Sequence, residues 1–230
     1  MNITDTKIGY WMSIISLFLF FIYTACFIII LFVNEPFIWT NVRAFAAYEA
    51  NSQSLYKYIG MGCMILYTCA FVVMVASIHS HIKAEKQFIY NITLIFSIAF
   101  CITVSIGYFV QLSATRLQLQ DGLIDGLVQF TQSFSHSAIN AINMLGWTLF
   151  YALASLFFSF LFNSSPHGRA ARIACRLNAA MMFVGMVGYI SDNYSVLLIT
   201  MNFGLGATGI GLLITTALFY NSLSKGSFDF

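Results

Sequence analysis

The chain has 230 residues, of which 60% are hydrophobic and only 8% are charged. Soluble domains carry about 25% charged residues, so this composition excludes an ordinary water-soluble domain. The formal net charge of +2 is too small to indicate a nucleic-acid partner. With two prolines in all, the chain offers long uninterrupted apolar runs, which are typical of helices that cross a membrane.

Six apolar segments are long enough to cross the hydrocarbon core of a bilayer, about 30 Å thick, as α-helices. The sequence therefore predicts an all-α integral membrane bundle of six transmembrane helices, forming a single domain over residues 1–230. The first segment lacks a small-residue cleavage site, so we interpret it as a retained span and not as a secretory signal. The spans are expected at residues 8–32, 58–79, 88–111, 138–162, 172–191 and 195–220, with a tight hinge at 192–194 between the last two.

The distribution of basic residues predicts the orientation of the bundle. Cytoplasmic loops are enriched in Lys and Arg, and the side that holds both termini has seven of these residues against three on the other side. Both termini are therefore expected in the cytoplasm. The cluster formed by Arg169, Arg172 and Arg176 is most simply an orientation signal, with an anionic-lipid site as the alternative. The seven are Lys7, Lys83, Lys86, Arg169, Arg172, Arg176 and Lys225, and the three are Arg43, Lys57 and Arg116.

Two longer connections, residues 33–57 and 112–137, fall on the opposite side. In the second, Leu117, Ile124 and Leu127 recur at helix-like intervals, so we expect a short extracellular helix between spans three and four. Two glycines in this connection work against a regular helix.

The segment HSAINAINMLGW, residues 136–147, carries four polar or aromatic side chains at helical spacing. His136, Asn140, Asn143 and Trp147 fall within an arc of about 60° on an α-helix, since each residue advances by 100°. The sequence therefore predicts one stripe that runs from the outer edge of span four toward its middle.

Polar side chains on three other spans are expected at the same depth. Leaving such groups unpaired in hydrocarbon costs several kcal/mol, so they should face the bundle interior or a wet cavity. The sequence therefore predicts an outward-facing polar pocket that binds a small molecule or a lipid headgroup. Its lining is expected to combine the stripe in span four with Tyr108, Gln111, Arg116, Tyr189, Asp192 and Asn202.

Two alternatives stay open for these residues. Asn140 and Asn143 fit a structural scaffold with no ligand, because Asn side chains hydrogen-bond between membrane helices and contribute about 0.6–2 kcal/mol per pair. His136 and Asp192 fit an intramembrane enzyme that acts on a lipid or isoprenoid, with the two side chains as acid–base groups. We favour binding over catalysis, because the sequence has no nucleophile turn or oxyanion-hole motif.

The sixth span contains GLGATGIG, residues 204–211. No strand precedes these glycines, so they predict close packing of membrane helices and not a nucleotide-binding loop. Ala180, Gly185 and Gly188 offer matching small positions in span five. No histidine pair or central lysine marks a haem or retinal site, and we expect no cofactor and no metal.

Two stretches carry a family resemblance: YFVQLSATRLQLQDGLIDGLVQFTQSFSHSAINAINMLGW, beginning at residue 108, and GYISDN, ending at residue 193. On these residues the chain resembles small bacterial multi-pass membrane proteins of unassigned function. The resemblance implies a six-span protein of the bacterial cytoplasmic (inner) membrane. In span four the related chains carry a Glu where this chain has asparagines, so the resemblance does not support acid–base chemistry there. It marks Gln111, Arg116, His136, Asp192 and Asn193 without implying an activity.

These patterns favour a sensor or a transport-related subunit. The sequence shows no duplicated half and no deeply placed carboxylate, which coupled transporters usually have. The expected partners are membrane lipid and a small-molecule ligand, and a second copy of the chain or another membrane subunit stays open.

Overall fold

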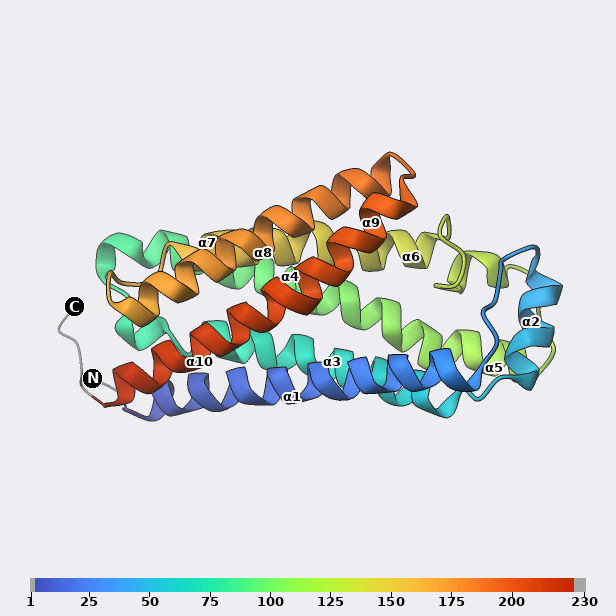
Figure 1. Cartoon of the computed structure of the whole chain (residues 1–230), viewed down its shortest axis with the longest axis horizontal. Helices are drawn as coiled ribbons and strands as arrows, with labels where there is room; N and C mark the ends of the chain where they lie inside the picture. The colour runs from blue at the N-terminus through green and yellow to red at the C-terminus, as the bar shows by residue number, and fades with distance from the viewer. Residues whose placement is uncertain (1–2, 226–230) are drawn as a thin grey trace.

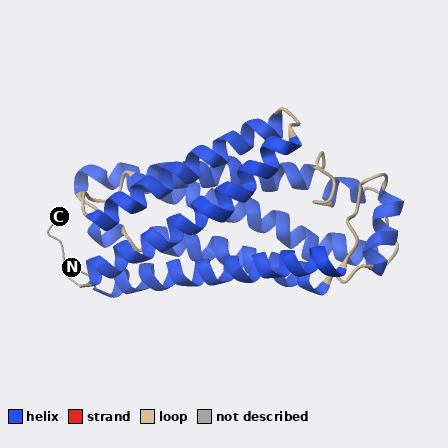
Figure 2. Cartoon of the chain, viewed as in Figure 1, coloured by secondary structure: helices blue, strands red, loops and turns tan. Residues whose placement is uncertain are grey.

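The computed structural model describes residues 3–225. Helix accounts for 83% of it, and the described residues contain no strand (Figure 2). Within this part of the chain, six helical rods are long and apolar enough to cross a membrane, which confirms the predicted all-α class and the number of apolar helices. The rods are Thr4–Val33, Leu55–His81, Ala84–Gln120, Ala138–Ser159, Pro166–Ile190 and Tyr194–Ser224.

Three of these rods contain a π-helical segment between α-helical parts. A π-helical turn accommodates more residues than an α-helical one, so it changes the register of the side chains that follow. The three composite rods are α4 (Gln87–Val110), η3 (Gln111–Thr115) and α5 (Arg116–Gln120); α6 (Ala138–Met144), η5 (Leu145–Phe150) and α7 (Tyr151–Ser159); and α9 (Tyr194–Met201), η6 (Asn202–Gly209) and α10 (Ile210–Ser224). The remaining helices are α1 (Ile3–Val33), α2 (Val42–Asn51), α3 (Leu55–Ala76) and α8 (Pro166–Ile190), with short 3₁₀ turns η1 (His79–His81), η2 (Ala84–Lys86) and η4 (Leu127–Phe130).

Side-chain caps decide where two of the rods begin. The Ser165 hydroxyl accepts a hydrogen bond from the Gly168 amide, and Pro166 occupies the first turn of α8. The fifth rod therefore begins at residue 166 and not at the predicted residue 172. The Ser137 hydroxyl accepts from the Asn140 amide in the same way, so α6 begins at residue 138.

The described ends of the chain lie at one end of the bundle, and α2 lies at the other (Figure 1). We call these the terminal end and the α2 end. At the terminal end Thr6 Oγ1 lies 2.8 Å from His81 Nε2, and Lys86 donates to the Phe160 carbonyl at 3.0 Å. The connections that follow α3 and α7 therefore share this end with the termini, as the even number of spans predicts. Arg172 donates to the Phe162 and Asn163 carbonyls in the connection between α7 and α8.

The expected short helix between spans three and four takes a different form. The third rod continues to residue 120, and the connection then turns at Gly122 and Gly126, which have φ values of 68° and 75°. This left-handed conformation is easily adopted by glycine and interrupts a helix. Only the 3₁₀ turn η4 follows, before the chain enters α6.

The predicted hairpin of the last two rods is present, and α8 ends in a Schellman motif. The Asn193 amide donates to the Gly188 carbonyl at 2.8 Å, and the Asp192 amide donates to the Tyr189 carbonyl at 3.2 Å. Asp192 has a φ of 52°, a left-handed conformation that glycine usually occupies at this position. The Asn193 side chain then caps α9 by accepting from the Val196 amide.

Small residues bring the two rods of this hairpin together. A Cβ atom on Gly185 would lie 3.0 Å from Thr200 Oγ1, and one on Gly204 would overlap the end of the Met182 side chain. Close packing is thus confirmed at these glycines. Gly206 and Gly211, by contrast, have open space beside them, and Ala180 is exposed. These three residues therefore do not contribute to the packing of the two rods.

An aromatic cluster fills the centre of the bundle. Trp147 is 1% exposed, and its ring lies 4.9 Å from that of Phe100, 6.0 Å from that of Tyr67 and 5.7 Å from that of Tyr151. The hydroxyls of Tyr67 and Tyr151 are 3.2 Å apart. These contacts link α3, α4 and the fourth rod.

A polar contact joins three segments at the same depth. Asn178 of α8 is fully buried, donates to Ser155 Oγ at 3.0 Å and accepts from Thr208 Oγ1 at 3.3 Å. Asn178 therefore has the structural role that polar side chains often take between membrane helices.

Candidate functional site

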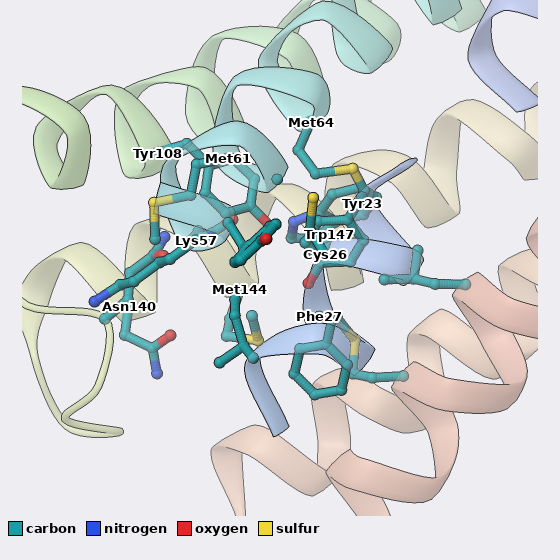
Figure 3. Close-up of a pocket in the computed structure, with 17 residues that line it drawn as sticks. Tyr23, Cys26, Phe27, Lys57, Met61, Met64, Tyr108, Asn140, Met144 and Trp147 are labelled. Carbon is teal, nitrogen blue, oxygen red and sulfur yellow. The ribbon is translucent and has the colours of Figure 1, made fainter. Parts of the chain in front are cut away.

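A cavity of about 290 Å³ lies between α1, α3, α4, the fourth rod and the sixth rod. Figure 3 shows side chains from several helices converging on it, with Lys57 and Asn140 on one side and Cys26 and Phe27 on the other. The cavity is lined by Tyr23, Cys26, Phe27, Ile30, Tyr56, Lys57, Gly60, Met61, Met64, Tyr108, Gln132, Asn140, Asn143, Met144, Trp147, Met201 and Leu205.

The lining has an apolar side and a polar side. Phe27 and Ile30 from α1 face the space together with Met201 and Leu205 from the sixth rod. The amide side chains come from the fourth rod and from the loop that precedes it. A molecule with both an apolar and a polar part matches this arrangement.

Two amide groups of the polar side have atoms without a partner. Asn143 is 3% exposed, and its Oδ1 atom forms no hydrogen bond within residues 3–225. The Nε2 atom of Gln132 is also buried and without a partner in that part of the chain. An unpaired buried polar group costs about 1–3 kcal/mol, so a ligand that satisfied both atoms would recover this free energy.

Gly107 of α4 allows these amides to lie close to the helix. A Cβ atom at this position would lie 3.1 Å from Asn143 Cβ and 3.2 Å from Gln132 Nε2. Any side chain larger than glycine would therefore displace both amides. The hydroxyl of Tyr108, the next residue, faces Tyr23, Asn143 and Trp147.

An ion pair connects the cavity to α2. Lys57 Nζ lies 2.7 Å from Glu49 Oε1 and 5.8 Å from the centre of the Phe45 ring. The Glu49 side chain is 7% exposed and the Lys57 side chain 24% exposed, so the carboxylate is shielded from solvent and the ammonium group is partly shielded. The one cation in the cavity wall is therefore already neutralised by an acid.

Aromatic residues form a cover at the α2 end, between α2 and the loop that precedes α6. Trp39 stacks on Phe134 with a ring separation of 5.0 Å and contacts Phe45 at 5.3 Å. Tyr48 stacks on Phe37 at 4.9 Å. Burial raises the pKa of the Tyr48 phenol, and the neighbouring Glu49 carboxylate raises it further, so this ring is neutral in the physiological range.

Gln111 positions the loop that carries Gln132. Its Nε2 donates to the Phe130 carbonyl, and its Oε1 accepts from the Gln132 amide at 3.2 Å. Thr115 Oγ1 also donates to the Phe130 carbonyl, at 2.9 Å. Gln111 therefore lies behind the cavity wall and acts through the loop.

Replacing Gln111 with Leu should destabilise this loop by about 1–2 kcal/mol, because the Phe130 carbonyl and the Gln132 amide, both partly buried, each lose a partner. Hydrogen–deuterium exchange should show faster exchange of the amides in residues 127–137. The matched control is Gln120→Leu, since Gln120 is exposed at the end of α5. Equal exchange in the two variants would contradict the positioning role.

A second cavity, of about 500 Å³, lies beside the α8–α9 turn. His136 Nε2 lies 3.2 Å from Asp192 Oδ1, which places the two side chains within hydrogen-bond reach. Their exposed fractions are 62% and 78%, so solvent reaches both. Tyr189 and Asn140 both donate to the Ser135 carbonyl at 3.0 Å, which ties the loop to α8.

The predicted residues therefore do not form a single chamber. His136, Tyr189 and Asp192 line the second cavity, because the Ser137 cap begins α6 at residue 138 and leaves His136 outside the helix. Asn202 is exposed and donates to the Leu198 carbonyl of its own helix. Arg116 donates to the Leu112 carbonyl. The predicted residues that line the first cavity are Tyr108, Asn140, Asn143 and Trp147.

The sequence-based prediction missed the side of the first cavity formed by α1 and α3. Tyr23, Met61 and Met64 lie in long apolar runs in which no pattern separates a cavity wall from a lipid-facing surface. Lys57 was considered only as an orientation signal. Its position at the start of an apolar span was the one available indication of a role in the site.

Within residues 3–225, no group of three or more His, Cys, Asp or Glu side chains is placed to hold a metal ion. No family model, curated protein or solved structure matches this chain.

Proposed function

We propose that the chain is an integral membrane protein whose terminal end faces the cytoplasm. Six apolar rods and large exposed apolar side chains support insertion into a bilayer; Phe18 and Ile95, for example, are 64% and 62% exposed. The excess of Lys and Arg among the segments at the terminal end supports the orientation. The resemblance of residues 108–193 supports the cytoplasmic membrane of a bacterium.

Within this topology, we propose that the protein binds a small molecule or a lipid in the 290 Å³ cavity, as a sensor or a transport-related subunit. The observation that carries the proposal is the pair of unpartnered buried amide atoms, Asn143 Oδ1 and Gln132 Nε2, in a lining that is otherwise largely apolar. Ligand sites commonly combine an apolar wall with a few convergent polar groups.

Asn143→Leu tests the proposal against a purely structural role. Because the Asn143 Oδ1 atom has no partner and the side chain's polar contact is with the Tyr108 hydroxyl, the stability of the ligand-free variant should stay within about 1 kcal/mol of that of the unmodified protein. Its affinity for the ligand should fall about tenfold, which corresponds to about 1.4 kcal/mol. The measurement is thermal unfolding of the delipidated full chain in detergent, titrated with a total bacterial lipid extract.

Asn202→Leu is the matched control, because Asn202 is exposed and bonded within its own helix. This variant should keep the full stabilisation by the extract. A loss of ligand-free stability in Asn143→Leu, with unchanged stabilisation by the extract, would show that Asn143 only joins helices.

The second candidate is an enzyme that uses His136 and Asp192 as acid–base groups on a lipid or isoprenoid. The 3.2 Å separation of the pair beside the 500 Å³ cavity favours it. The same titration discriminates between the candidates: His136→Ala should leave stabilisation unchanged if the ligand occupies the first cavity, and should reduce it if the ligand occupies the second.

A further inference from the structure

We infer that the first cavity takes a single-chain lipid with an uncharged headgroup that both donates and accepts hydrogen bonds, and that this lipid enters from the side, between α1 and η6. The inference rests on the proposed binding function and specifies the chemistry of the ligand.

The helices that flank the cavity diverge. α1 and α10 lie next to each other at the terminal end, and the chain from η6 to α9 moves away from α1 toward the α2 end (Figure 1). These two rods line the cavity with six side chains that are apolar apart from the Tyr23 hydroxyl and the Cys26 thiol: Tyr23, Cys26, Phe27, Ile30, Met201 and Leu205. The approach from this side therefore suits an acyl chain coming from the bilayer.

The α2 end of the cavity offers a different environment. Lys57 in the cavity wall is joined to Glu49 and lies over Phe45, which is 1% exposed. Trp39, packed on Phe45, also stacks on Phe134 of the loop before α6. Aromatic rings thus cover this end, and the ligand approaches from the hydrocarbon side.

The charges of the lining select an uncharged headgroup. Lys57 is the one charged residue that lines the cavity, and Glu49 lies 2.7 Å from its ammonium group. The remaining lining side chains are apolar or neutral polar groups. An ionised headgroup would lose its hydration without gaining a free counter-charge, which disfavours its binding.

The chemistry of the two unpartnered atoms determines which hydrogen-bonding groups the headgroup needs. Asn143 Oδ1 requires a donor, and Gln132 Nε2 requires an acceptor. A hydroxyl group meets both requirements, and so does the hydroxyl–ester headgroup of a monoacylglycerol. A volume of about 290 Å³ is at the small end of the range for ligand sites, which favours one chain over two.

Three lipids with the same oleoyl chain test the inference on the full-length protein in detergent at pH 8: 1-monooleoylglycerol, oleate and 1-oleoyl-lysophosphatidylcholine. Native mass spectrometry should show monooleoylglycerol bound at least tenfold more tightly than oleate, whose headgroup is an anion, or lysophosphatidylcholine, whose headgroup is a zwitterion. Asn143→Leu should reduce monooleoylglycerol binding about tenfold, and Leu205→Trp should reduce it by filling the apolar side of the cavity. Asn202→Leu should bind like the unmodified protein.

The outcomes separate the headgroup chemistry from the site itself. Equal or tighter binding of oleate or lysophosphatidylcholine, sensitive to Asn143→Leu, would overturn the uncharged headgroup and leave the proposed binding function intact. Binding that is lost in Asn143→Leu and unchanged in Leu205→Trp would overturn entry between α1 and η6. If neither substitution changes the binding of any probe or of the total lipid extract, the proposed function fails as well.

Discussion

Replacing Trp147 with Ala should lower the free energy of unfolding by about 3 kcal/mol. Trp147 is 1% exposed and packs against the rings of Phe100, Tyr67 and Tyr151, so the truncation leaves a large hole where three helical rods meet. Trp→Ala substitutions in cores cost about 3–5 kcal/mol. We expect the lower end of this range because, for the membrane protein proposed above, lipid or detergent and not water surrounds much of the unfolded chain.

The same substitution should enlarge the first cavity, since Trp147 forms part of its wall. Unfolding in detergent, followed by circular dichroism, measures the stability. Trp11→Ala is the control, because Trp11 is 58% exposed and should cost less than about 1 kcal/mol. Similar losses in the two variants would contradict the central position of the Trp147 ring in the core.

Replacing Gly188 with Val should separate α8 from α9 near their turn and cost about 2–3 kcal/mol. A Cβ atom at Gly188 would lie 2.9 Å from the backbone nitrogen of Leu197 and 3.0 Å from Val196 Cγ1. The obstacle is backbone, which cannot rotate aside as a flexible side chain can. Overpacking of this kind typically costs about 1–3 kcal/mol, and displacement of the turn adds to it.

Gly206→Val is the matched control, because a Cβ at Gly206 has no atom within 4 Å. Its stability should stay within about 0.5 kcal/mol of the unmodified protein, as for other substitutions without close neighbours. Gly188→Val should also disturb the His136–Asp192 pair, since Asp192 lies in the turn that the substitution displaces. Equal stability of Gly188→Val and Gly206→Val would contradict the close approach of the two helices.

The sequence predicted the six apolar rods because length and hydropathy are local properties. It also predicted the α8–α9 hairpin, since three residues leave no room for another connection, and it identified Gly185 and Gly188 as contact positions. The limits of the rods were less predictable. The third rod continues through a π-helical segment to residue 120, and the cap at Ser165 starts the fifth rod earlier than hydropathy alone indicates.

The arrangement of the candidate site was predictable only within one helix. Asn140, Asn143 and Trp147 line the same cavity, as their helical spacing indicates, although Trp147 lies in a π-helical segment. His136 was assigned to the same stripe, but the Ser137 cap excludes it from α6 and brings it to Asp192 instead. Ser137, a residue type preferred at helix N-caps, was the signal in the sequence that His136 lies outside the helix.

The sequence by itself determined the apolar character of the chain and the number of its apolar rods. Both depend on the sum of side-chain transfer free energies along each segment. The tertiary structure alone decided which polar groups meet. α1 and α3 have few polar residues to mark a face, so their contribution of Tyr23, Lys57 and the two methionines to the cavity depends on how the rods pack. Packing also determined which buried amide atoms lack a partner, and those atoms carry the proposed function.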